Sequence, residues 1–127
     1  MCELELEDQL RLLKDGLTEL AIEIGDTQIS PKSLSLLCLD FEVPVDIRDS
    51  WILEFRKLSE IEYEKYSSKE IISTFRNKMQ EGFEPAKYFS DLIVFSFIRV
   101  ISKNLVEELY PLYCYLLDDF SFAANLN

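Results

Sequence analysis

The segment from residue 86 to about residue 104 constrains the fold of this chain more than any other part of its sequence. Large apolar residues point in nearly every direction around a helix drawn through it, and they are Tyr88, Phe89, Leu92, Ile93, Val94, Phe95, Phe97, Ile98, Val100 and Ile101. A helix without a polar face has to be surrounded by other helices. The segment therefore predicts a buried central helix, and its apolar stretch at 92–101 is too short to cross a membrane.

A second helix is indicated near the start of the chain by a stripe of apolar residues. The stripe has the spacing 4-3-4-3-4 and consists of Leu6, Leu10, Leu13, Leu17, Leu20 and Ile24. Such residues share one face of a helix, and Gly25 is suited to end it. We expect the stripe to be a core face. A dimer seam is the alternative, and the partial alternation at 20–24 leaves a short strand open there.

Turn and cap residues divide the middle of the chain. Ser30 and Pro31 are expected to open a short helix that ends near Leu39 and buries Leu34, Leu37 and Cys38. Residues 40–49 contain Pro44 and four acids, and we expect a loop there. Its apolar residues are expected to pin the loop to the body of the protein, and they are Phe41, Val43 and Val45.

The remaining helices are marked by their first and last residues. Asp49 or Ser50 is expected to cap a helix that buries Trp51, Phe55 and Leu58 and continues to about residue 62. Ser67 and Glu70 have the spacing of a capping box, and the helix that they open is expected to stop at Gly82. The apolar residues that this helix buries are Ile71, Ile72, Phe75 and Met79.

The sequence as a whole predicts an all-α fold. Pro85 is expected in the first turn of the central helix, and Pro111 is expected to kink or split the last helix near Tyr110. No internal repeat and no low-complexity linker divides the chain. We therefore expect one domain, residues 1–127, built as a compact bundle of five or six helices around the central apolar helix.

The residues that most enzymes and metal sites need are missing. The chain has no histidine, which removes His-based acid–base catalysis, nucleophile pairs and metal ligation. No phosphate-binding glycine loop and no EF-hand loop is present. The three cysteines, Cys2, Cys38 and Cys114, are an odd and widely spaced set, expected to be small buried side chains in a reducing compartment. We expect no enzymatic activity, no catalytic residues, no cofactor and no metal.

Charge is the most informative functional feature. Residues 1–64 hold 16 acids and 6 bases, whereas residues 65–127 hold 8 acids and 7 bases. A net charge of -11 argues against binding to phosphate backbones or to anionic membranes. The acidic start also has none of the features of a secretory signal, so we expect a cytoplasmic protein.

The acids of the first half gather in two clusters. The first acidic cluster is Asp40, Glu42, Asp46 and Asp49, and the second acidic cluster is Glu60, Glu62 and Glu64, with Tyr63 among them. Clustered carboxylates repel one another unless a cationic surface meets them. We expect these eight residues to bind a basic protein partner, with Tyr63 as an aromatic anchor. A merely solubilising surface remains the alternative.

In size, acidity, lack of catalytic residues and preference for residues with AT-rich codons, the chain resembles the immunity proteins of bacterial contact-dependent inhibition systems and of colicins. The resemblance includes no shared motif. It implies an antitoxin that neutralises a cognate basic toxin, a nuclease in the first instance, by covering its active site or substrate groove. The protein itself is expected to be a monomer or weak dimer.

Two other classes of acidic protein remain open. One is a phage-type inhibitor that mimics nucleic acid, as anti-restriction and anti-CRISPR proteins do, which predicts carboxylates spaced like phosphates. The other is a small acidic secretion chaperone, which predicts an α+β fold with exposed apolar grooves.

Overall fold

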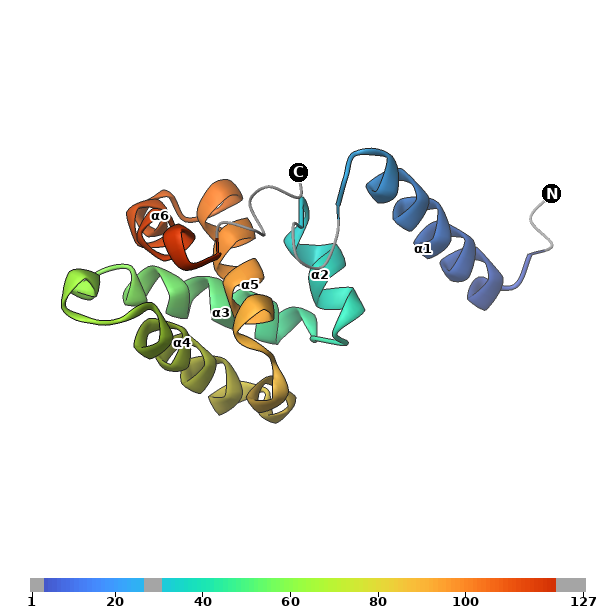
Figure 1. Cartoon of the computed structure of the whole chain (residues 1–127). Coiled ribbons are helices and arrows are strands. Elements are labelled where there is room, and N and C mark those ends of the chain that lie inside the picture. The colour runs from blue at the N-terminus through green and yellow to red at the C-terminus, as the bar shows by residue number, and fades with distance from the viewer. Residues whose placement is uncertain (1–3, 27–30, 121–127) are drawn as a thin grey trace.

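A computed structural model describes residues 4–26 and 31–120 of the chain. These residues form six α-helices and no strand (Figure 1). The helices are α1 (Leu6–Glu23), α2 (Leu34–Asp40), α3 (Val45–Leu58), α4 (Ser68–Gly82), α5 (Asp91–Asn104) and α6 (Tyr110–Leu117). Short 3-10 turns follow α3, α4, α5 and α6, at Tyr63–Lys65, Glu84–Tyr88, Glu107–Leu109 and Asp118–Phe120. The predicted all-α bundle is confirmed.

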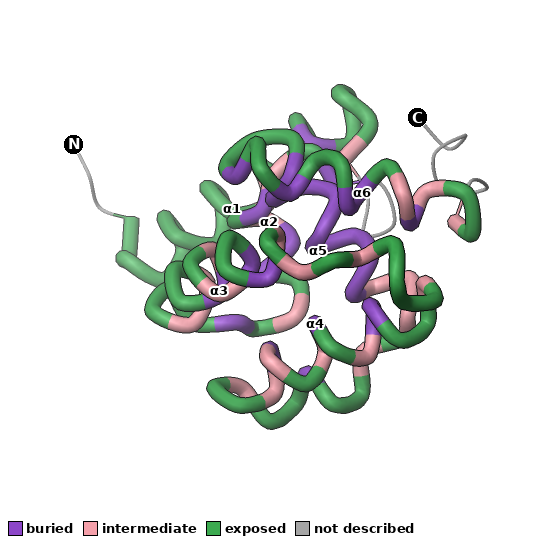
Figure 2. The backbone as a smooth tube through the Cα atoms, turned by 90° about the vertical axis from the view of Figure 1, so that its left-hand side faces the viewer, coloured by how far each residue is buried: buried purple, intermediate pink, exposed green. Residues whose placement is uncertain are grey.

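Helix α5 is the centre of the bundle. Every residue from 94 to 102 is buried, and Figure 2 shows α5 enclosed over most of its length. Helices α2, α3, α4 and α6 all contact it. The prediction of a central apolar helix is therefore confirmed, and even Arg99, which is 3% exposed, belongs to the interior.

The central helix begins later than predicted. Residues 84–88 form a 3-10 turn, and α5 starts after Ser90, whose hydroxyl accepts a hydrogen bond from the Ile93 amide at 3.2 Å. The prediction that Tyr88 belongs to the buried helix is wrong, since this side chain is 80% exposed. The Arg76 guanidinium of α4 holds the junction by donating to the Phe89 carbonyl at 3.0 Å and by pairing with Asp91.

Aromatic side chains join α3 to α4 and α5. The Trp51 ring meets the Phe97 ring edge-on at 5.3 Å, and its indole N–H donates to the Met79 carbonyl at 3.3 Å. Phe55 meets Phe75 edge-on at 4.9 Å. The predicted burial is confirmed for the residues of α3 and α4, which are Trp51, Phe55, Leu58, Ile71, Ile72, Phe75 and Met79.

Several predicted boundaries are confirmed. Ser67 and Glu70 form the capping box at the start of α4, which ends at Gly82. Pro111 lies in the first turn of α6, so the last helical segment is split near Tyr110.

Other boundaries in the middle of the chain are wrong. Helix α2 is capped by Ser33, whose hydroxyl accepts from the Leu36 amide; the predicted cap Ser30 lies outside the described residues. The predicted loop at 40–49 is mostly helical, because α3 begins at Val45 directly after Pro44. Val45 is 64% exposed and does not pin the chain to the body. Helix α3 also ends at Leu58 rather than near residue 62.

Helix α1 lies to one side of the bundle (Figure 1). It runs without interruption to Glu23, so the alternative of a strand at 20–24 is wrong. Gly25, with φ at 86°, ends it in a Schellman motif, in which the Asp26 amide donates to the Ala21 carbonyl at 2.8 Å. The prediction that its leucine stripe is a core face is also wrong. In α1 only Ala21 is buried, and the C-terminal part of the helix lies beside α2.

Candidate functional site

The residues predicted to bind a partner lie at opposite ends of α3. In the first acidic cluster, Asp40 ends α2, Glu42 lies in the turn, and Asp46 and Asp49 lie on the first turns of α3. The second acidic cluster lies just beyond the other end, around the 3-10 turn Tyr63–Lys65. Because α3 has 14 residues, it separates the clusters by about 20 Å. The structure does not unite the eight residues into one patch.

The turn of the first acidic cluster is strained at Glu42. Its φ is 58°, in the left-handed region that favours glycine. The Val43 amide donates to the Cys38 carbonyl at 2.8 Å, which is the bond of a Schellman motif with Glu42 in the glycine position. The backbone conformation therefore does not favour glutamate over glycine at this position.

We predict that Glu42→Gly stabilises the protein by about 1 kcal/mol, because glycine adopts this φ without the Cβ clash. Urea denaturation followed by circular dichroism measures the change. Glu42→Ala is the control, since alanine loses the carboxylate but keeps the clash and should give no gain. Equal gains from both variants would show that carboxylate repulsion, and not backbone strain, destabilises this turn.

The first acidic cluster carries charge that the fold does not neutralise. Within residues 4–26 and 31–120, Asp40, Glu42 and Asp46 are exposed and form no ion pair. Only Asp49 is paired, with Arg48 at 3.0 Å. The position of Asp46 in the first turn of α3 is favourable for the helix dipole, but it leaves the carboxylate open to solvent.

The second acidic cluster is tied more closely to the fold. The Tyr63 ring is half-buried and lies 5.2 Å from the Tyr115 ring of α6. The Tyr115 hydroxyl in turn donates to the Tyr66 carbonyl at 2.9 Å. Glu62 pairs with Lys65, while Glu60 and Glu64 form no ion pair with any described residue. Tyr63 therefore already has a packing role, which limits the ring surface it can offer to a partner.

Two apolar side chains that border the first acidic cluster are exposed, which the sequence did not predict. Leu39 is 44% exposed and Val45 is 64% exposed. They flank a hollow of about 160 Å³ between α2 and α3, whose other lining residues are Ser35, Cys38, Val43 and Arg48. Pro44 is a signal for the start of α3, but it does not determine which side of the helix Val45 occupies.

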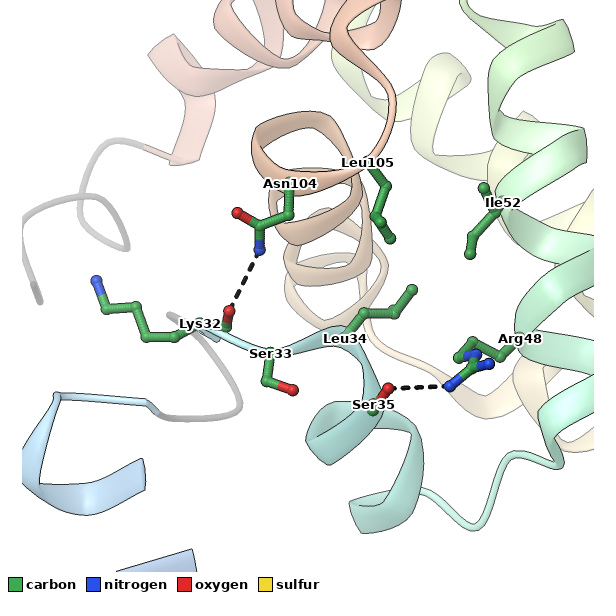
Figure 3. Close-up of a pocket in the computed structure, with 8 residues that line it drawn as sticks. All are labelled: Lys32, Ser33, Leu34, Ser35, Arg48, Ile52, Asn104 and Leu105. Atoms are coloured by element: carbon green, nitrogen blue, oxygen red, sulfur yellow. Dashed lines mark hydrogen bonds between the residues drawn. The ribbon is translucent and has the colours of Figure 1, made fainter. Parts of the chain in front are cut away.

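A larger pocket of about 380 Å³ opens between α2, α3 and the end of α5 (Figure 3). Leu34, Ile52 and Leu105 give it an apolar wall. Its polar groups hold the helices together: Arg48 donates to the Ser35 hydroxyl at 3.0 Å, and the Asn104 amide donates to the Lys32 carbonyl at 3.2 Å. In the part of the chain that the structure describes, no group of three or more Cys, Asp and Glu side chains could hold a metal ion.

The two described cysteines differ in their surroundings. Cys38 is buried as predicted, and burial raises the pKa of its thiol to about 11 against the opposing effect of the Arg48 guanidinium. Cys114 is exposed, so its predicted burial is wrong, and Cys2 lies outside the described residues. The Cys38 thiol stays protonated at neutral pH, which makes it a packing group and not a nucleophile.

Comparison of the chain with known protein families, with curated proteins and with solved structures gives no significant match. Among the described helices, none combines the length and the apolar character that a membrane crossing requires.

Proposed function

We propose that this chain is an immunity protein that binds a basic toxin of the nuclease class through the first acidic cluster. The observation that carries the proposal is the set of exposed carboxylates at Asp40, Glu42 and Asp46, which have no ion pair within the described part of the chain. A nuclease has to present positive charge to hold nucleic acid, and an acidic inhibitor meets that charge.

The charge distribution of the bundle supports this location. Residues 31–120 hold 16 acids and 11 bases, and 8 of those acids but only 3 of the bases lie in residues 40–64. The rest of the bundle is balanced, with 8 acids and 8 bases. The excess negative charge of the bundle therefore belongs to α3 and its two flanking turns.

The apolar side chains beside the first acidic cluster support it further. Protein interfaces combine an apolar centre with a polar rim. Leu39 and Val45 supply such a centre between α2 and α3, and the three unpaired carboxylates supply the rim. In this proposal Leu39 and Val45, and not Tyr63, are the anchors, and the second acidic cluster attracts the toxin from a distance.

The test is co-expression of this chain with the toxic domain encoded beside its gene. We expect the chain to restore growth, and purified complex should contain both proteins. A matched variant, Leu39→Ser with Val45→Ser, should lose protection, while Leu53→Ser should keep it, since Leu53 is 57% exposed elsewhere on α3. The proposal fails if no toxic domain is encoded there, or if its toxicity is unchanged by this chain.

A further inference from the structure

The leucine stripe of α1 is an apolar face that the described part of the fold leaves uncovered. Its members are between 52% and 68% exposed, and they are Leu6, Leu10, Leu13, Leu17, Leu20 and Ile24. The first turn of α1 has no side-chain cap, and Gly16 weakens its middle. Most of the stability of a helix in a protein comes from packing of its apolar face, so a surface that covers the stripe would stabilise α1.

We propose that the covering surface is α1 of a second copy of this chain, packed antiparallel. The spacing 4-3-4-3-4 is the period of a two-helix seam. The stripe is symmetric about its middle, so antiparallel copies pair Leu6 with Ile24, Leu10 with Leu20, and Leu13 with Leu17. One stripe then covers the other over its whole length.

A small residue beside the stripe allows the two helices to approach. Gly16 flanks the seam, and a Cβ built on it would meet no atom of the described residues within 4 Å outside the neighbouring backbone of its own helix. In the antiparallel alignment Gly16 faces its own copy across the seam. Lys14 also faces its own copy, at an exposed edge where water and salt screen the repulsion.

Repulsion between the two negatively charged bundles favours antiparallel over parallel packing of the α1 helices. Each α1 is joined at its C-terminal end to a bundle with excess negative charge. Parallel helices would bring the two bundles together, whereas antiparallel helices place them at opposite ends of a seam about 27 Å long. That separation exceeds the Debye length of about 8 Å at physiological salt, so the repulsion is screened.

A groove lies at the C-terminal end of α1. It has a volume of about 420 Å³, its apolar lining residues include Leu17, Leu20, Ile24 and Leu36, and its charged ones are Glu23, Asp26 and Lys32. The antiparallel arrangement directs the N-terminal end of the second α1 toward this groove. Leu6 of that copy then meets the apolar wall of the groove.

Sedimentation of the full chain, with mass measured across a range of concentrations, tests the proposal. We expect a species of twice the 14.9 kDa chain mass. Leu13→Ser with Leu17→Ser should weaken self-association at least about 100-fold. The matched control is Leu12→Ser with Ile22→Ser, which removes two equally exposed side chains, 61% and 67%, outside the stripe and should leave the dimer intact.

The orientation is tested by the distance between two spin labels. Asp8→Cys, made with Cys2→Ser and Cys114→Ser, carries one label per chain near the start of α1. Antiparallel helices keep the labels more than about 20 Å apart, whereas parallel helices hold them side by side. A chain that is monomeric at all concentrations overturns the proposal. So does a dimer that survives the stripe substitutions, or one whose labels lie side by side. None of these measurements involves a toxin, so they are independent of the immunity function.

Discussion

Phe95→Ala is expected to lower the free energy of unfolding by about 4 kcal/mol, the typical loss when a large buried ring is removed from a well-packed interior. Phe95 is fully buried in α5. Its ring stacks on Tyr113 of α6 at 5.4 Å and on Phe120 at 4.5 Å. The substitution therefore leaves a cavity at the place where the central helix meets the C-terminal helices. Guanidinium denaturation followed by circular dichroism measures the change.

Tyr88→Ala is the control for this substitution. It removes a comparable ring that is 80% exposed, and we expect a change within about 0.5 kcal/mol. If Phe95→Ala also costs less than about 1 kcal/mol, then α5 is not packed on all sides and the arrangement of helices around it is incorrect.

The sequence predicted those helices whose boundaries are coded locally. The start of α4 is determined by Ser67 and Glu70, because the side chain of each accepts a hydrogen bond from the backbone amide of the other. The core of α5 is equally clear, because apolar residues on all its sides leave only a central position. Its start was predicted too early, since Pro85 opens the 3-10 turn Glu84–Tyr88 and α5 begins only after its N-cap, Ser90.

Helix α1 shows what periodicity leaves undetermined. Its stripe predicted the helix and its end at Gly25 correctly, because both depend on local residues. The surface that covers the stripe is not a local property, because an apolar stripe of this spacing occurs both on core faces and on two-helix seams. Our choice of the core was therefore wrong although the helix was right.

The sequence predicted where the negative charge of the candidate site lies, but not how its residues are arranged in space. Counting residues located the negative charge in the first half of the chain, and the structure keeps these carboxylates exposed. The separation of the two acidic clusters depends on α3 lying between them, and the sequence predicted this helix but placed its start after Asp49 rather than at Val45. Exposure of Leu39 and Val45 depends on how α2 and α3 cross, which the spacing of residues does not reveal.

Reversing the charge of the first acidic cluster is expected to have the largest effect on function. Asp40→Lys with Glu42→Lys and Asp46→Lys should slow association with the cognate toxin at least about 10-fold in 0.01 M salt, because steering by complementary charge accelerates encounter. Stopped-flow or surface-based binding kinetics measure the rate. The effect should shrink at 0.1 M salt, since the Debye length falls from about 30 Å to about 10 Å.

The matched control reverses Glu107, Asp118 and Asp119, which are exposed and lie in the half of the chain with almost no excess charge. It changes the net charge by the same amount, so an equal loss of association rate in both triple variants would indicate an effect of total charge and not of a docking site.

The dissociation rate distinguishes direct contact from long-range attraction. Leu39→Ser with Val45→Ser should mainly raise the off-rate, and this change should persist at high salt. If the reversed cluster binds with an unchanged rate at both salt concentrations, the acidic half only keeps the protein in solution. The interface would then lie on the C-terminal half, where Tyr110 is 49% exposed.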